Sequence, residues 1–183
     1  MKKLIDYALR LLVICVAASG LLAYVYQSTA SRIEENVYRE KLFKAKEVLS
    51  GRAEEIKKMD HNGLEFFRGF SKGLLVGTVI ETSGAGYGGP IRVLSGIGPD
   101  GKIIEIAILS HKETPGLGTK VDTSWFKNQF VSKSASGVRL KKDLKPGDAD
   151  GIDAITSATI SSRAVSKAVS EALAEYEKVK NVR

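Results

Sequence analysis

One uncharged apolar stretch near the N-terminus, Leu11–Tyr26, constrains this chain more than any other feature. Extending it back to Tyr7 adds a single charge, Arg10, and gives about 20 residues, roughly the ~30 Å thickness of a hydrocarbon core. Arg10 can extend to the headgroups near one end, and Tyr24 and Tyr26 suit the membrane interface at the other. The stretch therefore predicts one membrane-spanning helix.

A cleaved signal peptide is the alternative interpretation, because Lys2 and Lys3 form a basic start and Ala17-Ala18-Ser19 offers small residues. The apolar residues continue to Tyr26, whereas a removed signal ends near its cleavage site. We therefore predict a retained, single-pass anchor in the cell (inner) membrane. By the positive-inside rule, the basic N-terminus lies in the cytoplasm and everything after Gln27 lies outside it.

Composition narrows the classes of function. The chain has 28 Lys plus Arg against 21 Asp plus Glu, a formal net charge of +7. Basic residues alternate with acidic ones through Arg32–Lys58, and no Lys/Arg-rich segment contains interspersed aromatic residues. Both features disfavour nucleic-acid binding. The only cysteine, Cys15, lies in the apolar stretch, so a disulfide framework, cysteine-ligated zinc and iron-sulfur clusters are excluded. Redox chemistry would therefore need an organic cofactor.

The rest of the chain divides by its residue patterns. Apolar residues recur with roughly helical spacing over Ser31–Leu49, and Gly51 is a plausible helix stop. We expect a cytoplasmic stub and anchor over residues 1–27, a juxtamembrane helix region over 28–60, and an α+β domain over 61–183.

Between Leu64 and Leu109 the pattern is typical of β structure. Three segments are rich in Ile, Val and Leu and are separated by glycines: Leu74–Thr82, Ile91–Ile97 and Lys102–Leu109. The sequence Gly98-Pro99-Asp100-Gly101 predicts a tight turn, because proline presets φ and the last glycine accepts a positive φ. We therefore expect an antiparallel sheet.

The C-terminal segment after Thr159 predicts an amphipathic helix, because apolar residues recur at i, i+1, i+4 and i+5. The expected buried face consists of Ala164, Val165, Ala168, Val169, Ala172, Leu173 and Tyr176. We expect this face to pack on the sheet.

The hydroxyl-rich turn Asp153–Ser162 precedes this helix. A helix N-terminus offers unpaired N–H groups and the positive end of the helix dipole, so a phosphate esterified to a hydroxyl here would be stabilised. Arg163 can add a charge-assisted contact. The alternative is that Thr159, Ser161 or Ser162 simply caps the helix.

Two loops can complete a binding site: His111–Gly118 after one strand and Gly84–Ile91 before another. They supply backbone amides, an aromatic ring and few ionisable groups, which suits a flavin ring better than acid-base catalysis. The alternative for the first loop is a surface turn with His111 and Glu113 exposed. Those two residues are too few for a metal site, and no helix directly follows the glycines of Gly84–Ile91, as a dinucleotide site would require.

Three motifs occur in order behind the N-terminal span: Gly-Tyr-Gly-Gly-Pro-Ile, His-Lys-Glu-Thr-Pro-Gly-Leu-Gly and Asp-Ala-Ile-Thr-Ser-Ala-Thr-Ile-Ser-Ser. In these motifs the chain resembles the G subunit of the Rnf ion-translocating electron-transport complex. It is also similar to the C subunit of sodium-pumping NADH:quinone reductase, which shares the FMN-binding domain. The resemblance covers nearly the whole chain, and the compact length favours the Rnf member.

The resemblance implies a covalent cofactor. In that family FMN is joined through its phosphate to the last threonine of a Ser/Thr-Gly-Ala-Thr motif, which maps here onto Thr156-Ser157-Ala158-Thr159. The chain departs from the motif at Ser157, where the family has glycine, and Thr159 is kept as the attachment point. The expected cofactor-binding residues are Tyr87, His111, Glu113, Thr114, Gly116, Leu117, Gly118, Thr156, Ser157, Ala158 and Thr159.

The resemblance further implies an electron relay inside an ion-translocating ferredoxin:NAD⁺ oxidoreductase complex, rather than an enzyme with its own small-molecule substrate. Expected partners are membrane proteins of that complex carrying flavin or iron-sulfur centres, and a separate flavin transferase that attaches FMN from FAD. A non-redox membrane-tethered scaffold and a free-standing flavin reductase are the alternatives.

Overall fold

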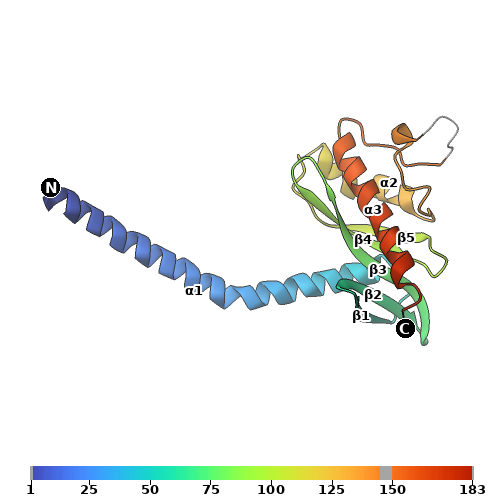
Figure 1. Ribbon diagram of the computed structural model, residues 1–183, viewed down its shortest axis with the longest axis horizontal. Helices are drawn as coiled ribbons and strands as arrows, with labels where there is room; N and C mark the ends of the chain where they lie inside the picture. The colour runs from blue at the N-terminus through green and yellow to red at the C-terminus, as the bar shows by residue number, and fades with distance from the viewer. Residues whose placement is uncertain (1, 145–149, 183) are drawn as a thin grey trace. The chain divides into compact units, whose positions relative to one another are not determined.

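The computed structural model describes residues 2–144 and 150–182 (Figure 1). The chain divides into two compact units, residues 1–40 and residues 41–183, with the division inside the first helix.

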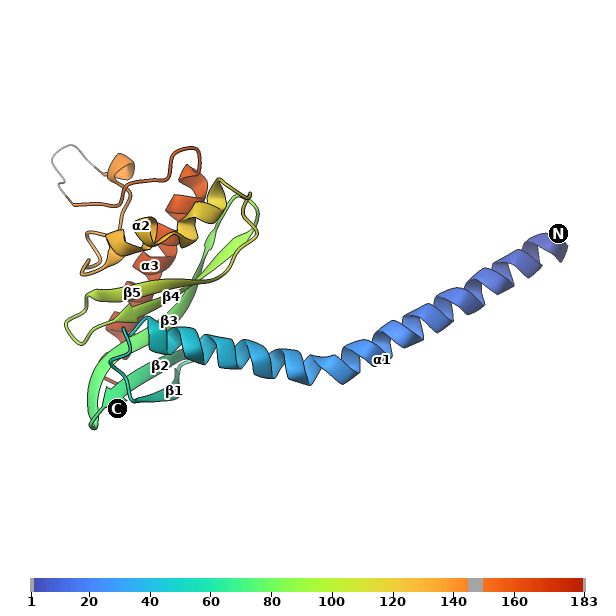
Figure 2. The same cartoon turned by 180° about the vertical axis from the view of Figure 1, so that it is seen from behind.

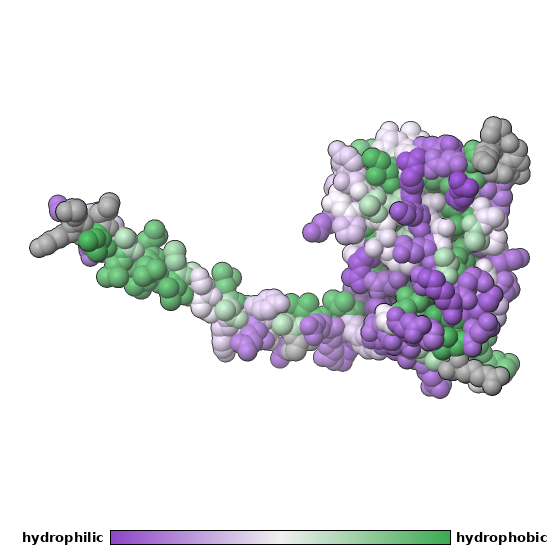
Figure 3. All heavy atoms as spheres, viewed as in Figure 1, coloured by the Kyte–Doolittle hydropathy of each residue, from purple (hydrophilic) through white to green (hydrophobic). Residues whose placement is uncertain are grey.

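The first unit consists of most of helix α1, Lys2–Glu47. Its large apolar side chains between Ile5 and Tyr26 are exposed, and Figure 3 shows them along the first part of the helix. The hydroxyls of Ser19, Ser28 and Thr29 donate to carbonyls four residues earlier at 2.7–2.9 Å. Such back-bonding satisfies these polar groups within the helix, and Ser19, the one of the three inside the predicted span, is the one for which lipid requires it. By length and composition, α1 is the one helix in the described part of the chain that can cross a membrane.

The helix predicted over Ser31–Leu49 is the second part of α1 rather than a separate helix. No glycine or proline lies between Gln27 and Glu47, so nothing interrupts the backbone hydrogen bonds where the apolar stretch gives way to charged residues. The helix ends at Glu47, and Gly51, the predicted stop, lies in the following turn with φ +65°.

The second unit is built on an antiparallel five-stranded sheet with the strand order of the sequence. Its strands are β1 (Glu55–His61), β2 (Leu64–Ser71), β3 (Leu74–Ala85), β4 (Pro90–Ile97) and β5 (Ile103–Ser110). The three predicted strands correspond to β3, β4 and β5. The predicted turn is also confirmed, because the Gly98 N–H donates to the Lys102 carbonyl at 2.8 Å where β4 turns into β5. The antiparallel sheet expected from the sequence is thus confirmed.

Strands β1 and β2 were not singled out by the sequence pattern. β1 is an edge strand whose side chains are exposed or half-buried, so charged residues dominate it and hide the alternation. The overlooked signal is Asn62-Gly63, the commonest pair in two-residue hairpin turns, with φ values of +54° and +80° here. Strand β1 begins at Glu55, six residues before the domain boundary expected at residue 61.

Helix α3 (Thr159–Val179) packs on one face of the sheet, against β3 and β4 (Figures 1 and 2). All seven residues of the predicted apolar face are at most 4% exposed, which confirms the amphipathic helix. At Gly84 on β3, an added Cβ would lie 2.0 Å from the Ala164 carbonyl oxygen. Only glycine permits this approach, which fixes the first turns of α3 against the sheet.

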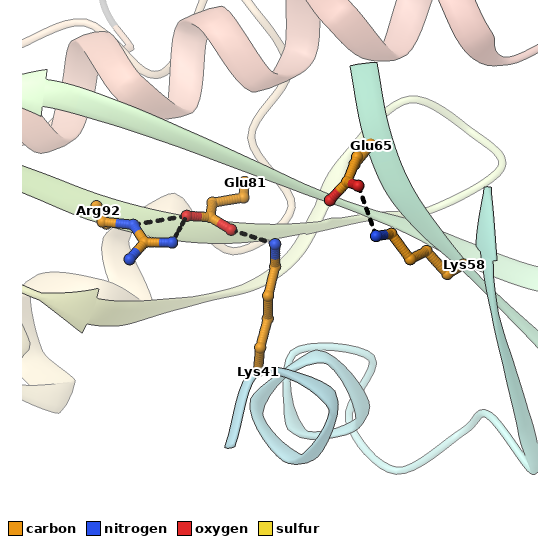
Figure 4. A network of polar contacts seen from close by, with 5 residues as sticks. All are labelled: Lys41, Lys58, Glu65, Glu81 and Arg92. Atoms are coloured by element: carbon orange, nitrogen blue, oxygen red, sulfur yellow. Dashed lines mark hydrogen bonds and ion pairs between the residues drawn. The ribbon is translucent and has the colours of Figure 1, made fainter. Parts of the chain in front are cut away.

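The opposite face of the sheet is covered by residues at the end of α1 and just after it. Ala45, Val48, Leu49 and Ala53 are buried there with Phe67 and its apolar neighbours on the sheet. Lys41 lies on the same side and its ammonium contacts the Glu81 carboxylate at 2.5 Å, while Arg92 donates to the other oxygen (Figure 4). The sheet is therefore enclosed on both faces.

The described part of the connection from β5 to α3 includes four short helices: η1 (Gly118–Asp122), α2 (Ser124–Lys127), η2 (Asn128–Phe130) and η3 (Lys141–Asp143). It contributes buried Val121, Phe126, Phe130 and Leu140 to the core under α3. Since these residues hold the connection in place, η3 lies beside the start of α3.

A buried arginine holds the other end of α3. The Arg68 guanidinium on β2 donates to the carbonyl of Val179 at 2.7 Å and to that of Val182. These are carbonyls at the negative end of the helix dipole, where a cation is favourable. Helix α3 is thus fixed at both ends.

Candidate functional site

A cleft of about 570 Å³ opens where three predicted segments meet. Its lining comes from the β3–β4 loop, the segment after β5, and the start of α3: Tyr87, Glu113, Thr114, Leu117, Gly118, Ser157, Ala158, Thr159, Ile160 and Ser161. Eight of the eleven residues expected from the sequence are in this set. His111, Gly116 and Thr156 are not among the lining residues, although each is in or next to a lining segment.

Glu113 ties the three segments together. Its carboxylate is buried, with 6% of the residue exposed, and one oxygen accepts the Gly88 N–H at 3.0 Å. The other oxygen accepts the Ser161 hydroxyl from the first turn of α3. The alternative of an exposed, inert loop is therefore wrong for Glu113, while His111 is half-buried and its Nδ1 lies 3.3 Å from the Glu113 backbone nitrogen.

The close packing around this carboxylate explains Gly118. A Cβ at Gly118 would lie 2.5 Å from a Glu113 carboxylate oxygen and 2.8 Å from the Ser161 hydroxyl. Any larger residue would push apart the contact between the loop and the helix.

The hydroxyls before and within α3 do not cap it. The N-cap residue is Ala158, with no side-chain capping bond. The Ser162 hydroxyl donates to the Ala158 carbonyl at 2.9 Å and accepts the Ile155 N–H at 3.0 Å, and the Ser161 hydroxyl is bound to Glu113. The capping alternative is therefore wrong, and Thr159 is the first residue of the helix, half-buried at the edge of the cleft.

The Thr159 hydroxyl accepts a hydrogen bond of 2.5 Å from the ammonium of Lys142, on η3. Arg163, which the sequence offered as a further charge-assisted contact, donates to both oxygens of Asp143 at 2.7 and 2.8 Å. That hydrogen bonding lowers the pKa of Asp143. The cation at the Thr159 hydroxyl is thus a lysine from another segment of the chain.

Sequence reasoning missed Lys142 and Ile160. Nothing in the run Lys141-Lys142-Asp143 distinguishes one lysine from the other, so no local signal predicts the contact. Ile160 did carry a sequence signal, because it is an apolar residue outside the predicted buried face of the helix. In the structure it is 50% exposed.

Ser157 has a left-handed backbone conformation, with φ +64°. This is the position at which the sequence motif has glycine in the family that the chain resembles. A residue with a Cβ is strained in this conformation, by about 1–2 kcal/mol relative to the right-handed region. The backbone at this turn therefore keeps a glycine-like conformation despite the serine.

The rim of the cleft is apolar. Tyr87, Leu117 and Ile160 are exposed and line the opening, and Glu113 is the only carboxylate of the lining. An apolar cleft with a hydroxyl and a cation at one edge suits a flat aromatic ligand that carries a phosphate at one end.

Comparison with known families agrees with this interpretation. The class that this fold and cleft define is an FMN-binding domain, whose family model matches residues 86–174. The G subunit of the Na⁺-translocating ferredoxin:NAD⁺ oxidoreductase complex of Acetobacterium woodii is 36% identical over 194 residues, covering 96% of this chain and 93% of that protein. The G subunit of the ion-translocating oxidoreductase complex of Methanosarcina acetivorans is 31% identical over 181 residues, covering 94% of each.

The chain therefore belongs to the family of G subunits of ion-translocating oxidoreductase complexes, as the sequence resemblance implied. A further relative is the G subunit of the proton-translocating ferredoxin:NAD⁺ oxidoreductase complex of Clostridium ljungdahlii. It is 43% identical over 95 residues, and the match spans 52% of this chain and 50% of that protein.

Solved structures share the fold. The crystal structure of Shewanella oneidensis NqrC superposes with a TM-score of 0.52 at 24% identity, covering 64% of this chain and 59% of that one. The C subunit of Na⁺-translocating NADH-quinone reductase from Parabacteroides distasonis gives a TM-score of 0.54 at 23% identity, covering 66% and 64%. The expected α+β fold of an FMN-binding domain behind an apolar helix is thus confirmed.

Proposed function

We propose that this chain is a membrane-anchored flavoprotein that carries FMN on Thr159 and relays electrons within an ion-translocating ferredoxin:NAD⁺ oxidoreductase complex. One observation carries the covalent part of the proposal: the Thr159 hydroxyl lies at the edge of an apolar cleft, in the first turn of α3, beside a lysine ammonium. A phosphoester there would be stabilised by the helix dipole and by that charge.

Thr159 is favoured over the four other hydroxyls of the segment Thr156–Ser162. Ser161 and Ser162 are buried and engaged with Glu113 and with the backbone. Thr156 is exposed but does not line the cleft, and Ser157 lines it without a cation contact among the described residues. Thr159 alone among the five combines access, the cleft and a positive charge.

The remaining residues have distinct proposed roles toward FMN, which supplies the electron-carrying chemistry when bound. Tyr87, Leu117 and Ile160 provide apolar contact area at the rim, where they exclude water. Glu113 holds the loops in place, and Thr114, Gly118 and Ala158 complete the wall.

Three of the expected site residues, His111, Gly116 and Thr156, do not line the cleft, and their proposed role is to shape the loops and the turn around it. His111 lies next to the Glu113 N–H, and Gly116 makes a turn at φ +77° with its N–H bonded to Thr119. Thr156 begins the turn that leads to Thr159.

The proposal includes orientation and partners. The basic residues before the span favour a cytoplasmic N-terminus and an extracytoplasmic second unit, in the cell (inner) membrane. A covalent link suits a carrier that cannot recover a lost cofactor outside the cytoplasm. Its partners would be membrane proteins of the same complex with flavin or iron-sulfur centres, and a transferase that uses FAD would attach the cofactor.

The experiment is the mass of the intact chain, produced in cells that contain the transferase and purified in detergent. The expected mass exceeds that of the bare chain by FMN minus water, and the denatured band fluoresces under ultraviolet light. Thr159→Ala should lose both signals completely, and the control Thr156→Ala, three residues earlier and outside the cleft, should keep both. A bare wild-type chain would reject the covalent flavin, and a colourless native preparation would in addition favour a non-redox scaffold.

A further inference from the structure

Helix η3 contacts the first two turns of α3 through neighbouring residues. Lys142 donates to Thr159 at 2.5 Å, and Asp143 accepts both hydrogen bonds of Arg163 at 2.7 and 2.8 Å. Thr159 and Arg163 are four residues apart, so they lie on the same face of the helix. The bidentate pair between Asp143 and Arg163 therefore places the neighbouring Lys142 over Thr159.

The cations that flank Lys142 and Thr159 on η3 and α3, Lys141 and Arg163, are paired with carboxylates, and Arg139 donates to the Asp143 backbone carbonyl at 3.4 Å. Lys141 binds Asp153 at 2.7 Å, and Arg163 binds Asp143. Within residues 2–144 and 150–182, Lys142 has no carboxylate within 4 Å, and its hydrogen-bond partner is the Thr159 hydroxyl. One positive charge is thus left at the hydroxyl that opens α3.

We propose that Lys142 is the charge partner of the phosphoester on Thr159, and that it directs flavin attachment to this hydroxyl. The inference rests on the proposed function, because it concerns the same attachment site. A phosphodiester carries one negative charge, which the ammonium of Lys142 balances at hydrogen-bonding distance.

The attachment step balances without any redox change. A bond forms between Thr159 Oγ1 and the flavin-side phosphorus of FAD, and the bond from that phosphorus to the bridging pyrophosphate oxygen breaks. Adenosine monophosphate leaves with the electron pair of the broken bond, and the hydroxyl proton passes to the transferase or to solvent. Lys142 acts on this step by attracting the pyrophosphate to the hydroxyl and by stabilising the negative charge that stays on the product.

The test uses the full chain in detergent, purified from cells without the transferase and then incubated with purified transferase and FAD. The initial rate of covalent flavin incorporation is read from in-gel fluorescence. Because a charge-assisted hydrogen bond is lost, Lys142→Gln should lower the rate about tenfold. Lys142→Arg should keep it within about threefold of wild type, since the charge and a donor remain.

The matched control is Lys141→Gln, which removes the same charge from the same short helix without a contact to Thr159. It should leave the rate within about twofold, as expected of an exposed ion pair. A rate for Lys142→Gln equal to wild type overturns the inference. So does an equal fall in Lys141→Gln, which would mean that net charge matters and contact does not.

Failure of this inference is distinct from failure of the proposed function. If the wild-type chain takes up no covalent flavin, the attachment at Thr159 is wrong. If wild type is flavinylated and Lys142→Gln is unaffected, only the role of Lys142 is wrong. Failure of Lys142→Arg to recover the rate also overturns the role, since a positive charge would then be insufficient.

Discussion

Removal of the Glu113 side chain should destabilise the cleft even in the flavin-free protein. The buried carboxylate accepts hydrogen bonds from Gly88 and Ser161, which belong to the two other segments of the site. Hydrogen bonds to a charged group contribute about 1.5–3 kcal/mol each, but the cost of burying the charge offsets part of this. We expect Glu113→Ala to lower the free energy of unfolding by about 2–3 kcal/mol.

Glu113→Gln should cost less, because the amide oxygen can accept the Gly88 N–H while its NH₂ donates to the Ser161 hydroxyl. What is lost is the extra strength of the charge, about 1 kcal/mol. In a unit of this size, 1 kcal/mol corresponds to about 2–4 °C in Tm. The expected falls in Tm are therefore about 4–12 °C for Glu113→Ala and about 2–4 °C for Glu113→Gln.

The assay is thermal unfolding of the flavin-free full chain in detergent, followed by fluorescence of Trp125, the only tryptophan, which lies on α2 in the second unit. Thr114→Ala is the control, because it truncates the neighbouring, exposed side chain of the same loop and should shift Tm by less than about 2 °C. If Glu113→Ala unfolds at the wild-type temperature, the carboxylate does not hold the segments together and the reasoning is refuted.

Two further predictions concern the turn before α3 and the sheet. Ser157→Gly should be more stable than Ser157→Ala by about 1 kcal/mol in urea unfolding, because only glycine is unstrained at φ +64°; equal stabilities would contradict the strain. Burial alone would raise the pKa of Glu81, but hydrogen bonds from Lys41 and Arg92 outweigh it and lower the pKa. Since the folded pKa lies below the unfolded one, the stabilisation is present above the unfolded pKa and disappears as pH falls through the folded value. Glu81→Gln should thus cost about 1 kcal/mol at pH 7, and this cost should fall steadily as the pH drops below the unfolded pKa of the carboxyl. A pH-independent difference in unfolding free energy would count against the ion pair.

The predictable parts of the fold are those with a local cause. Strands β3 to β5 and the turn Gly98–Gly101 follow from apolar runs and turn chemistry, and α3 follows from its periodic face. Strand β1 was not predicted, because an edge strand buries few side chains. Its sequence is therefore mostly polar and lacks the apolar run that marks the central strands. The continuity of α1 was not predicted, because the thickness of a membrane sets the length of the apolar stretch but not the end of the helix. The backbone remains helical through the change from apolar to charged residues.

The sequence predicted the three segments that form the site, but not the side-chain contacts between them. Each of the three motifs contributes to the cleft, yet the contacts that close it join residues far apart in the sequence. Glu113 binds Ser161, 48 positions later, and Lys142 binds Thr159, 17 positions later. Sequence spacing does not encode such pairs, because they depend on how the β5–α3 connection packs under the helix.

The choice of one hydroxyl among five shows what tertiary structure adds. In the sequence, Thr156, Ser157, Thr159, Ser161 and Ser162 are chemically similar, and only the resemblance to a family distinguishes one of them. In the fold, two of the five are committed to internal hydrogen bonds, and their burial removes them from any enzyme that would modify the chain. The helix start then places Thr159 at the cleft, and η3 brings a charge to it. Under the proposed function, selectivity of attachment would follow from the same contacts that hold the domain together. A change that weakens those contacts should then broaden modification to neighbouring hydroxyls as well as slow it.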